Sequence, residues 1–364
     1  MSNIIHCGKY DVFVGNDTFL QLGKFLGQRY PDSRKVILTD SHTKAHCLPL
    51  IQDRVLALKD ADVLEIDAGE SAKTLISCEK IWQQLSDLHA DRKTLLINLG
   101  GGMVCDTGGF AASVFLRGID FIHIPTTLLS MVDSAVGGKT GINFAGLKNQ
   151  VGTFSRPAAV FISPVWLRTL PEREVRSGFA EMIKHALFSS REKWDTLSQI
   201  TSLDGIDWIP AIRESVILKN RIVNADFRDR HQRKTLNFGH TIGHALESYS
   251  LRSHTDPLKH GEAVALGMIG ELFLSEQLVH LPAATAASAI AFLSNHFNHL
   301  RLEFDKAEVL EHMKCDKKNE GARIKFVLLN DIGHPLINQQ PGEEMIYKAM
   351  DFIFEHTGKP ALQS

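Results

Sequence analysis

The feature that most constrains the fold is an apolar run, TLLINLG at residues 94–100, that leads directly into consecutive glycines. A helical pattern follows these glycines, so the segment is typical of a buried strand that turns tightly into a helix. The stretches 35–40 and 121–125 are also short apolar runs, and residues 71–90 between them have apolar side chains at helical spacing. This strand–helix–strand alternation predicts a parallel sheet with helices on both faces.

The second half of the chain has a different pattern. Beyond about Ile162 most segments have apolar residues at helical spacing, namely 176–188, 209–225, 260–278 and 283–297. One exception, at 322–338, predicts a hairpin that turns at residues 330–333. We therefore expect an α/β domain at residues 1–162 and a mainly α-helical domain at residues 163–364.

Composition excludes several classes of protein. The chain of 364 residues has a formal net charge of -2 and a pI of about 6.8, so a nucleic acid or an anionic membrane is not an expected partner. Its five cysteines form no CxxC pair, which argues against a disulfide framework and favours a reducing compartment. With neither a signal-peptide pattern nor an apolar run of ~20 residues, we expect a soluble cytoplasmic protein.

The glycines at 100–102 are a candidate phosphate site. Glycine lets the backbone approach a phosphate closely, and a following helix N-terminus offers free N–H groups. The motif is neither GxGxxG nor a Walker loop, so a plain strand-to-helix turn is the alternative. Asp40 and Glu70, with Lys73, follow other strands of this half and could bind ribose hydroxyls or simply cap a turn.

A second candidate is the stretch 125–154, which is rich in glycines and hydroxyl side chains. Asp133, Lys139, Lys148 and Asn149 lie within it. Flexible backbone with lysines suits a phosphate or a polyol. A glycine-rich surface loop is the alternative interpretation.

A third candidate is a metal site. In NFGHTIGHALE, at 237–247, His240 and His244 are four residues apart and share one face of a helix. With Glu181 and His260, one or both of them could complete a set of two histidines and one carboxylate that keeps a position open. Thr241 follows His240, so the HExxH motif of zinc peptidases is absent. Chance grouping among 17 histidines is the alternative.

Taken together, six ordered motifs closely resemble the 3-dehydroquinate synthase family, from the first strands to near the C-terminus. They are GGGMVCDTGGFAAS, RGIDFIHIPTTLLSMVDSAVGGKTGIN, LKNQVG, TLPEREVRSGFAEMIKHAL, LNFGHTIGHALE and HGEAVALGM. The resemblance implies conversion of 3-deoxy-D-arabino-heptulosonate 7-phosphate to 3-dehydroquinate and phosphate in the shikimate pathway. It implies a catalytic NAD+ and a divalent metal, Zn2+ or Co2+, and a transient oxidation, a β-elimination, a reduction and an aldol closure.

The resemblance also assigns residues. The implied metal ligands are Glu181, His240 and His260. The implied catalytic and substrate-lining residues are Asp133, Lys184, Lys219, Arg233, Asn237 and His244, with Lys219 and Arg233 as a clamp for the substrate carboxylate. The implied phosphate-binding residues are Lys139, Asn149, Lys317 or Lys318, and Arg117 from a second subunit, which implies a homodimer.

For NAD+, the resemblance implies a Rossmann-like N-terminal domain. The implied contacts are Asp40, Glu70, Lys73, Gly101, Gly102, Met103, Asp106, Thr126, Thr127, Leu129, Lys139, Lys148, Thr169, Leu170 and Glu174. Cys105 departs from the glycine that is common in the family at this position, beside the predicted pyrophosphate turn. The 248–259 segment between the two histidine motifs is of the longer kind, and its His254 is a weak rival for the metal.

Three alternatives remain at this level. Other sugar phosphate cyclases, which make 2-epi-5-epi-valiolone or 2-deoxy-scyllo-inosose, share the cofactors, but their substrates lack the carboxylate that Lys219 and Arg233 would bind. A metal-dependent polyol dehydrogenase of related fold would release NADH. An inactive NAD- or metal-binding protein is the alternative from a different class.

Overall fold

The computed structural model describes residues 4–145, 147–300, 303–314 and 323–357. The chain forms two compact units, one from the residues up to Pro171 with Asp207–Arg228, and one from Glu172–Ile206 with the residues from Asp229 onward. The division proposed from the sequence, 1–162 and 163–364, is simpler than this. It assigns helix α8 (Trp208–Ala225) to the second domain, whereas this helix belongs to the first unit.

The first unit is built on a seven-stranded sheet with the order β1-β2-β9-β6-β5-β3-β4. The strands are β1 (Ile4–His6), β2 (Asp11–Val14), β3 (Lys35–Asp40), β4 (Asp62–Ile66), β5 (Leu95–Gly100), β6 (Asp120–Pro125) and β9 (Ala159–Ile162). All neighbours pair in parallel except β1, which pairs antiparallel with β2. Every residue of β5 is buried, as expected for a parallel strand covered on both faces. The predicted α/β class is confirmed.

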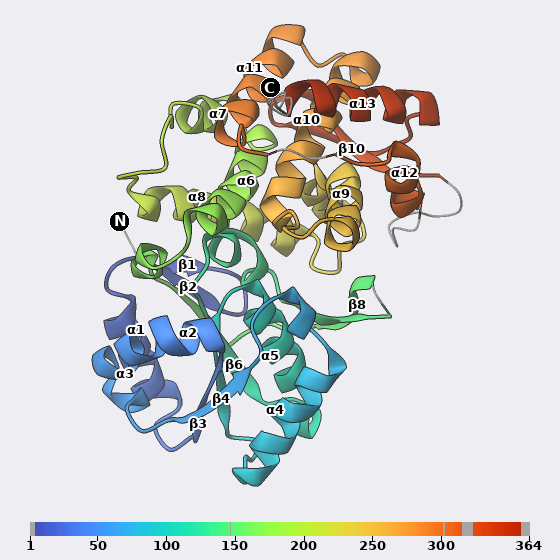
Figure 1. The fold of residues 1–364 in the computed structure, drawn as a ribbon. Coiled ribbons are helices and arrows are strands. Elements are labelled where there is room, and N and C mark those ends of the chain that lie inside the picture. The colour runs from blue at the N-terminus through green and yellow to red at the C-terminus, as the bar shows by residue number, and fades with distance from the viewer. Residues whose placement is uncertain (1–3, 146, 301–302, 315–322, 358–364) are drawn as a thin grey trace, which may run out of the picture. The chain divides into compact units, whose positions relative to one another are not determined.

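Helices cover both faces of this sheet (Figure 1). The helices are α1 (Thr18–Arg29), α2 (Ser41–His46), α3 (Leu48–Arg54), α4 (Leu75–Asp87) and α5 (Gly102–Val114), in addition to α8. On one face, Val36, Leu38 and Leu96 of the strands join Ile81 of α4 and Val104 of α5 in one buried cluster. On the other, α1 packs on β2 and β9. The alternation of side chains along each strand supplies both cores.

A separate hairpin and several short helical turns complete the first unit. Strands β7 (Lys139–Phe144) and β8 (Leu147–Phe154) pair antiparallel, and β7 packs on α5. The short turns of this unit are η1 (Leu56–Leu58), η2 (Glu70–Ala72), η3 (Phe115–Arg117), η4 (Ser130–Ser134) and η5 (Pro164–Arg168).

The second unit is mainly helical, as predicted. Its elements are α6 (Glu172–Leu187), α7 (Arg191–Leu197), η6 (Gln232–Asn237), α9 (His240–Ser253), α10 (His260–Val279), α11 (Ala283–His296), α12 (Lys306–Lys314), the hairpin β10 (Phe326–Asp331) and β11 (His334–Gln339), and α13 (Glu343–His356). Helix α10 packs against α6, α9, α11, α13 and β10, so it is apolar nearly all round. Among the helices described, none combines the length and the apolar character needed to span a bilayer.

Candidate active site

The start of helix α9 holds His240 at a fixed place in the second unit. Gly239 has φ of +79°, and a Cβ there would lie 2.5 Å from Met268 Cγ and 2.9 Å from the Val264 carbonyl oxygen of α10. Only glycine fits this close approach. The fully buried carboxylate of Glu271 accepts hydrogen bonds from the backbone N–H groups of Gly239 (2.6 Å) and Thr241 (3.1 Å). A carboxylate therefore caps the positive end of the helix on both sides of His240.

Three helices bring one carboxylate and three histidines together. Oε1 of Glu181, on α6, lies 3.6 Å from Nε2 of His240 and 3.7 Å from Nε2 of His260. His244 belongs to the same group, since ligand atoms of the three histidines all lie within 4.8 Å of one another. The other oxygen of Glu181 is paired with the ammonium of Lys184, one turn along α6, and both side chains are buried.

The two candidate histidine ligands each have their other ring nitrogen held by an acceptor. Nδ1 of His240 lies 3.1 Å from the Phe238 carbonyl oxygen, and Nδ1 of His260 lies 3.3 Å from Oε2 of Glu247. Because these oxygens only accept hydrogen bonds, each Nδ1 carries the proton and each Nε2 faces Glu181.

The cluster favours positive charge. Burial lowers the pKa of His260, but the carboxylates of Glu247 and Glu181 outweigh this effect and raise it to about 9. Imidazole nitrogens and a carboxylate oxygen are also the ligands that zinc and cobalt accept in proteins. The residues therefore fit a divalent metal. The distances do not separate His244 from the other two histidines, so its assignment to the substrate side still depends on the family resemblance.

In the first unit, the glycine turn lies at the carboxyl edge of the sheet, where parallel sheets bind ligands. β5 ends at Gly100, Gly101 is the N-cap of α5, and Thr127 follows β6 beside it. A Cβ on Gly101 would lie 3.0 Å from Thr127 Cγ2, and one on Gly102 would lie 2.8 Å from Ser134 Oγ. The backbone N–H groups at the start of α5 can bind a phosphate here.

A buried lysine connects this turn to the hairpin. The Lys73 ammonium donates to Oδ2 of Asp106 at 2.7 Å and to Oδ1 of Asn149 at 2.5 Å. Burial raises the pKa of Asp106 above its usual value, and the neighbouring Lys73 partly opposes that rise. The structure thus brings two residues of the expected NAD+ set together with one of the expected phosphate set.

A second ion pair of the first unit joins α8 to η4. The Lys219 ammonium donates to Oδ1 of Asp133 at 2.7 Å and also to the Asp133 carbonyl oxygen. Lys219 is only 4% exposed. Both groups are thus held in place before any substrate binds.

The remaining expected residues have varied surroundings. Asp40 caps α2 through the Thr43 N–H at 2.7 Å, and Glu70 accepts from Asn143 at 2.9 Å, so both act at least as turn residues. Thr126 is buried, Met103, Leu129, Lys148, Leu170 and Asn237 are partly exposed, and Arg117, Lys139 and Thr169 are exposed. Arg233 is buried in η6, and Glu174 is paired with Lys259 at 2.9 Å. Lys317 and Lys318 lie outside the described residues.

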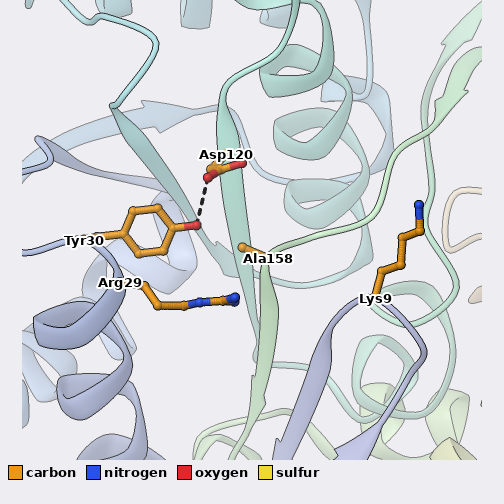
Figure 2. A pocket seen from close by; sticks show the side chains of 5 residues that line it. All are labelled: Lys9, Arg29, Tyr30, Asp120 and Ala158. Carbon is orange, nitrogen blue, oxygen red and sulfur yellow. Dashed lines mark hydrogen bonds between the residues drawn. The ribbon is translucent and has the colours of Figure 1, made fainter.

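One pocket of the first unit lies away from all of these residues. It has a volume of about 490 Å³ and is lined by Lys9, Arg29, Tyr30, Asp120 and Ala158. Figure 2 shows the Tyr30 hydroxyl donating to Asp120, at 2.9 Å. Asp120 is the first residue of β6, so this pocket lies at the amino end of that strand, whereas the glycine turn follows the carboxyl end of β5.

Two residues that hold the cluster in place were missed from the sequence. Glu247 ends the quoted histidine motif and contacts His260, which is 13 residues away, and Glu271 caps the start of α9 from α10. A glutamate on an amphipathic helix carries no signal by itself. Only the packing of α9 on α10 shows that these two carboxylates turn inward.

Comparison with known proteins finds one family along most of the chain. Residues 63–177 match the family model "3-dehydroquinate synthase N-terminal", and residues 178–319 match "3-dehydroquinate synthase C-terminal". The chain is 43% identical to the 3-dehydroquinate synthase of Parabacteroides distasonis, over 95% of this chain and 98% of that protein. It is 37% identical to the 3-dehydroquinate synthase of Methylacidiphilum infernorum, over 93% of each.

Solved structures show the same fold. A 2-deoxy-scyllo-inosose synthase complexed with carbaglucose-6-phosphate, NAD+ and Co2+ superposes with a TM-score of 0.84 at 22% identity, covering 95% of this chain and 96% of that one. The 2-epi-5-epi-valiolone synthase of Streptomyces hygroscopicus subsp. jinggangensis 5008, with NAD+ and Zn2+ bound, gives 0.80 at 25% identity, covering 95% and 97%.

Proposed function

This chain belongs to the 3-dehydroquinate synthase family, and from that premise we propose how its residues divide the reaction. The activity is conversion of 3-deoxy-D-arabino-heptulosonate 7-phosphate to 3-dehydroquinate and phosphate, with NAD+ and a divalent metal as cofactors. The observation that carries the proposal furthest is the cluster of Glu181, His240 and His260, because a metal-dependent reaction needs such a set.

Glu181, His240 and His260 would hold the metal, which we propose to be Zn2+ or Co2+. When bound, the metal would polarise the substrate oxygen at the carbon that is oxidised. Lys184 pairs with the second oxygen of Glu181, which orients that carboxylate toward the histidines. His244 is close enough to the group to contact the same substrate.

The carboxyl edge of the first sheet would hold NAD+, which accepts the hydride and later returns it. The start of α5 offers N–H groups to the pyrophosphate, and Gly101 and Gly102 leave room for it. Lys73 holds Asp106 in place beside this turn. Asp40 is the last residue of β3, and Glu70 follows β4 at the start of η2, at the same edge. The other assigned contacts are Met103, Thr126, Thr127, Leu129, Lys139, Lys148, Thr169, Leu170 and Glu174.

The resemblance assigns substrate-binding roles to polar groups in each unit. In the first, Asp133 and Lys219 are already paired, so the ammonium is held at one position. In the second, the Arg233 guanidinium can bind a carboxylate through two parallel hydrogen bonds, and Asn237 lies at the other end of the same turn, η6. These residues suit a substrate that has a carboxylate and several hydroxyls.

The residues proposed to bind the phosphate come from separate segments of the chain and from a second subunit. Lys139, Asn149 and Lys317 or Lys318 would bind the phosphate, with Arg117 supplied by a second subunit of a homodimer. The β7–β8 hairpin supports an interface, since it exposes several large apolar side chains. These are Phe144, Leu147, Val151 and Phe154. A cytoplasmic location fits the four described cysteines, which are all buried thiols.

The test is a direct assay. Metal-replete protein, catalytic NAD+ and 3-deoxy-D-arabino-heptulosonate 7-phosphate are mixed, and phosphate release and dehydroquinate formation are followed together. We expect both products in equal amounts, and no reaction after a chelator has removed the metal. Heptulose 7-phosphate and glucose 6-phosphate serve as controls that lack the carboxylate. Turnover of either control, with none of the acid, would instead identify one of the sibling cyclases.

A further inference from the structure

The imidazole of His260 stands between two carboxylates. Its Nε2 lies 3.7 Å from Oε1 of Glu181, and its Nδ1 lies 3.3 Å from Oε2 of Glu247. The ring is rigid, so whatever holds Nδ1 also sets the direction in which Nε2 points. Because a carboxylate only accepts, the contact with Glu247 keeps a proton on Nδ1, so a metal would bind at Nε2 in exchange for the proton there.

Glu247 is built into the same helix as the other histidines. It follows His240 by seven residues and His244 by three, so the three side chains share one face of α9. Glu247 is 4% exposed, and it reaches His260 at the first residue of α10. One face of α9 therefore supplies a candidate ligand and also holds the ligand of the neighbouring helix.

The two candidate ligands are held in different ways. The acceptor for Nδ1 of His240 is the backbone carbonyl of Phe238, at 3.1 Å, whereas the acceptor for His260 is a charged side chain. A carbonyl is neutral, but Glu247 adds a second negative charge beside that of Glu181. Carboxylate partners of ligating histidines orient the ring and make it a stronger ligand.

We propose that Glu247 is a positioning residue that fixes the tautomer and the direction of His260, so that its Nε2 is presented to the metal. The proposal rests on the ligand role of His260 in the proposed function. Glu247 does not touch the metal, and it acts only through the imidazole.

The test measures metal affinity in the complete chain, with Co2+ as the probe and a competing chelator, alongside the visible absorption of bound Co2+. For Glu247→Ala we expect a loss of roughly 10–100-fold in Co2+ affinity and a changed absorption spectrum. For Glu247→Gln we expect a smaller loss, because the amide oxygen can still accept from Nδ1 but the charge is gone. Glu276→Gln is the matched control, since it removes one carboxylate from α10 about 24 Å along the helix from His260.

A double-mutant cycle separates positioning from a general structural role. In the His260→Ala background, Glu247→Ala should cause no further loss of Co2+ affinity, because the ring on which it acts is gone. Equal losses in both backgrounds would overturn the proposal. So would unchanged affinity and spectrum in both Glu247→Ala and Glu247→Gln.

The cycle also distinguishes this proposal from the ligand assignment. If His260→Ala binds Co2+ as tightly as the unaltered protein, the metal assignment of the proposed function is wrong, and Glu247 has no ligand to position. If His260→Ala loses Co2+ while both Glu247 variants keep it, the metal site stands and only the positioning role is wrong. Should Glu247→Ala fail to fold, Glu247→Gln decides through the spectrum.

Discussion

Two histidines, one in each unit, show how different surroundings give the same side chain opposite properties. His123 lies in the core of the first unit beside the Asn98 amide, and burial alone lowers its pKa to about 3. His260 of the second unit is also desolvated, yet the carboxylates of Glu247 and Glu181 raise its pKa to about 9. Burial without an opposite charge gives a neutral packing residue, whereas burial between carboxylates gives a site for a cation.

The same contrast applies to the units as wholes. The first presents backbone N–H groups and glycines at strand ends, which suit an anionic cofactor. The second presents side chains from packed helices, which suit a metal ion. A substitution at the strand ends of the first unit should therefore change binding of NAD+ and leave metal binding intact. A substitution in the histidine cluster of the second unit should do the reverse.

The largest expected effect tests the second unit. His240→Ala removes a proposed ligand, so bound metal and turnover should fall together, by more than the roughly 10–100-fold typical of an indirect residue. Metal content measured after gel filtration, with NAD+ affinity measured on the same sample, checks this. NAD+ binding should persist. His254→Ala is the control, because the sequence leaves His254 as a rival ligand; full metal in His240→Ala with loss in His254→Ala would reverse the assignment.

The next effect concerns the substrate. Arg233→Lys keeps the charge but loses the bidentate geometry, so substrate binding should weaken by about 1.5–3 kcal/mol, or roughly 10–150-fold. NAD+ affinity should be unaltered. Steady-state KM for each compound gives the comparison, and Arg230→Lys, at an exposed neighbouring position, is the control. Equal weakening of substrate binding and NAD+ binding would show that Arg233 does not bind the substrate carboxylate.

An effect on folding stability, rather than on binding, tests the neutral histidine. The pKa of His123 is about 3 in the folded chain, whereas in the unfolded chain this imidazole binds a proton below about pH 6.5. The unfolded state therefore binds more protons between these values, and stability falls as the pH drops, by up to about 1.4 kcal/mol per pH unit. Urea unfolding from pH 7 to pH 4 should show a shallower fall in His123→Phe. His42→Asn removes an exposed imidazole and is the control; an unchanged slope in His123→Phe would assign the acid sensitivity to other groups.

The smallest effect tests the glycine turn. Gly102→Ala places a Cβ 2.8 Å from Ser134 Oγ, so either the turn or the Ser134 hydroxyl must move, and NAD+ should bind more weakly by about 1 kcal/mol, roughly fivefold. Metal content should not change. Gly23→Ala on α1 meets nothing within 4 Å and serves as the control. Titration of NAD+ by fluorescence measures both variants, and loss of metal in Gly102→Ala would contradict the separation of the two sets.

Much of the fold was predictable because buried parallel strands have continuous apolar runs. The runs at 35–40, 94–100 and 121–125 became β3, β5 and β6, and the hairpin predicted at 322–338 became β10 and β11. The stretch 139–154 was noted only as glycine-rich and polar, yet it forms two paired strands. Hairpin pairing of this kind depends on neighbours such as α5, and the sequence pattern did not reveal them.

The candidate site was predictable only where several of its residues lie close together in the sequence. The spacing of His240 and His244 predicted a shared helix face, but it could not choose between them. The link from Glu247 to His260 depends on how α9 and α10 pack, and local periodicity does not carry that information. Helical periodicity likewise predicted α8, but it could not show that this helix belongs with the first unit.

That return of α8 has a consequence for how the protein is made. The first unit lacks one of its parts until Arg228 has been synthesised, although its sheet is complete by Ile162. At about 5–20 residues per second, translation of residues 172–228 takes roughly 3–11 s, and the first unit stays incomplete for that time. During that interval α6, which carries Glu181, has left the ribosome before α9 and α10 exist to cover it. A nascent chain paused here would present apolar surface that is buried in the finished protein, so a chaperone could bind at this stage of synthesis.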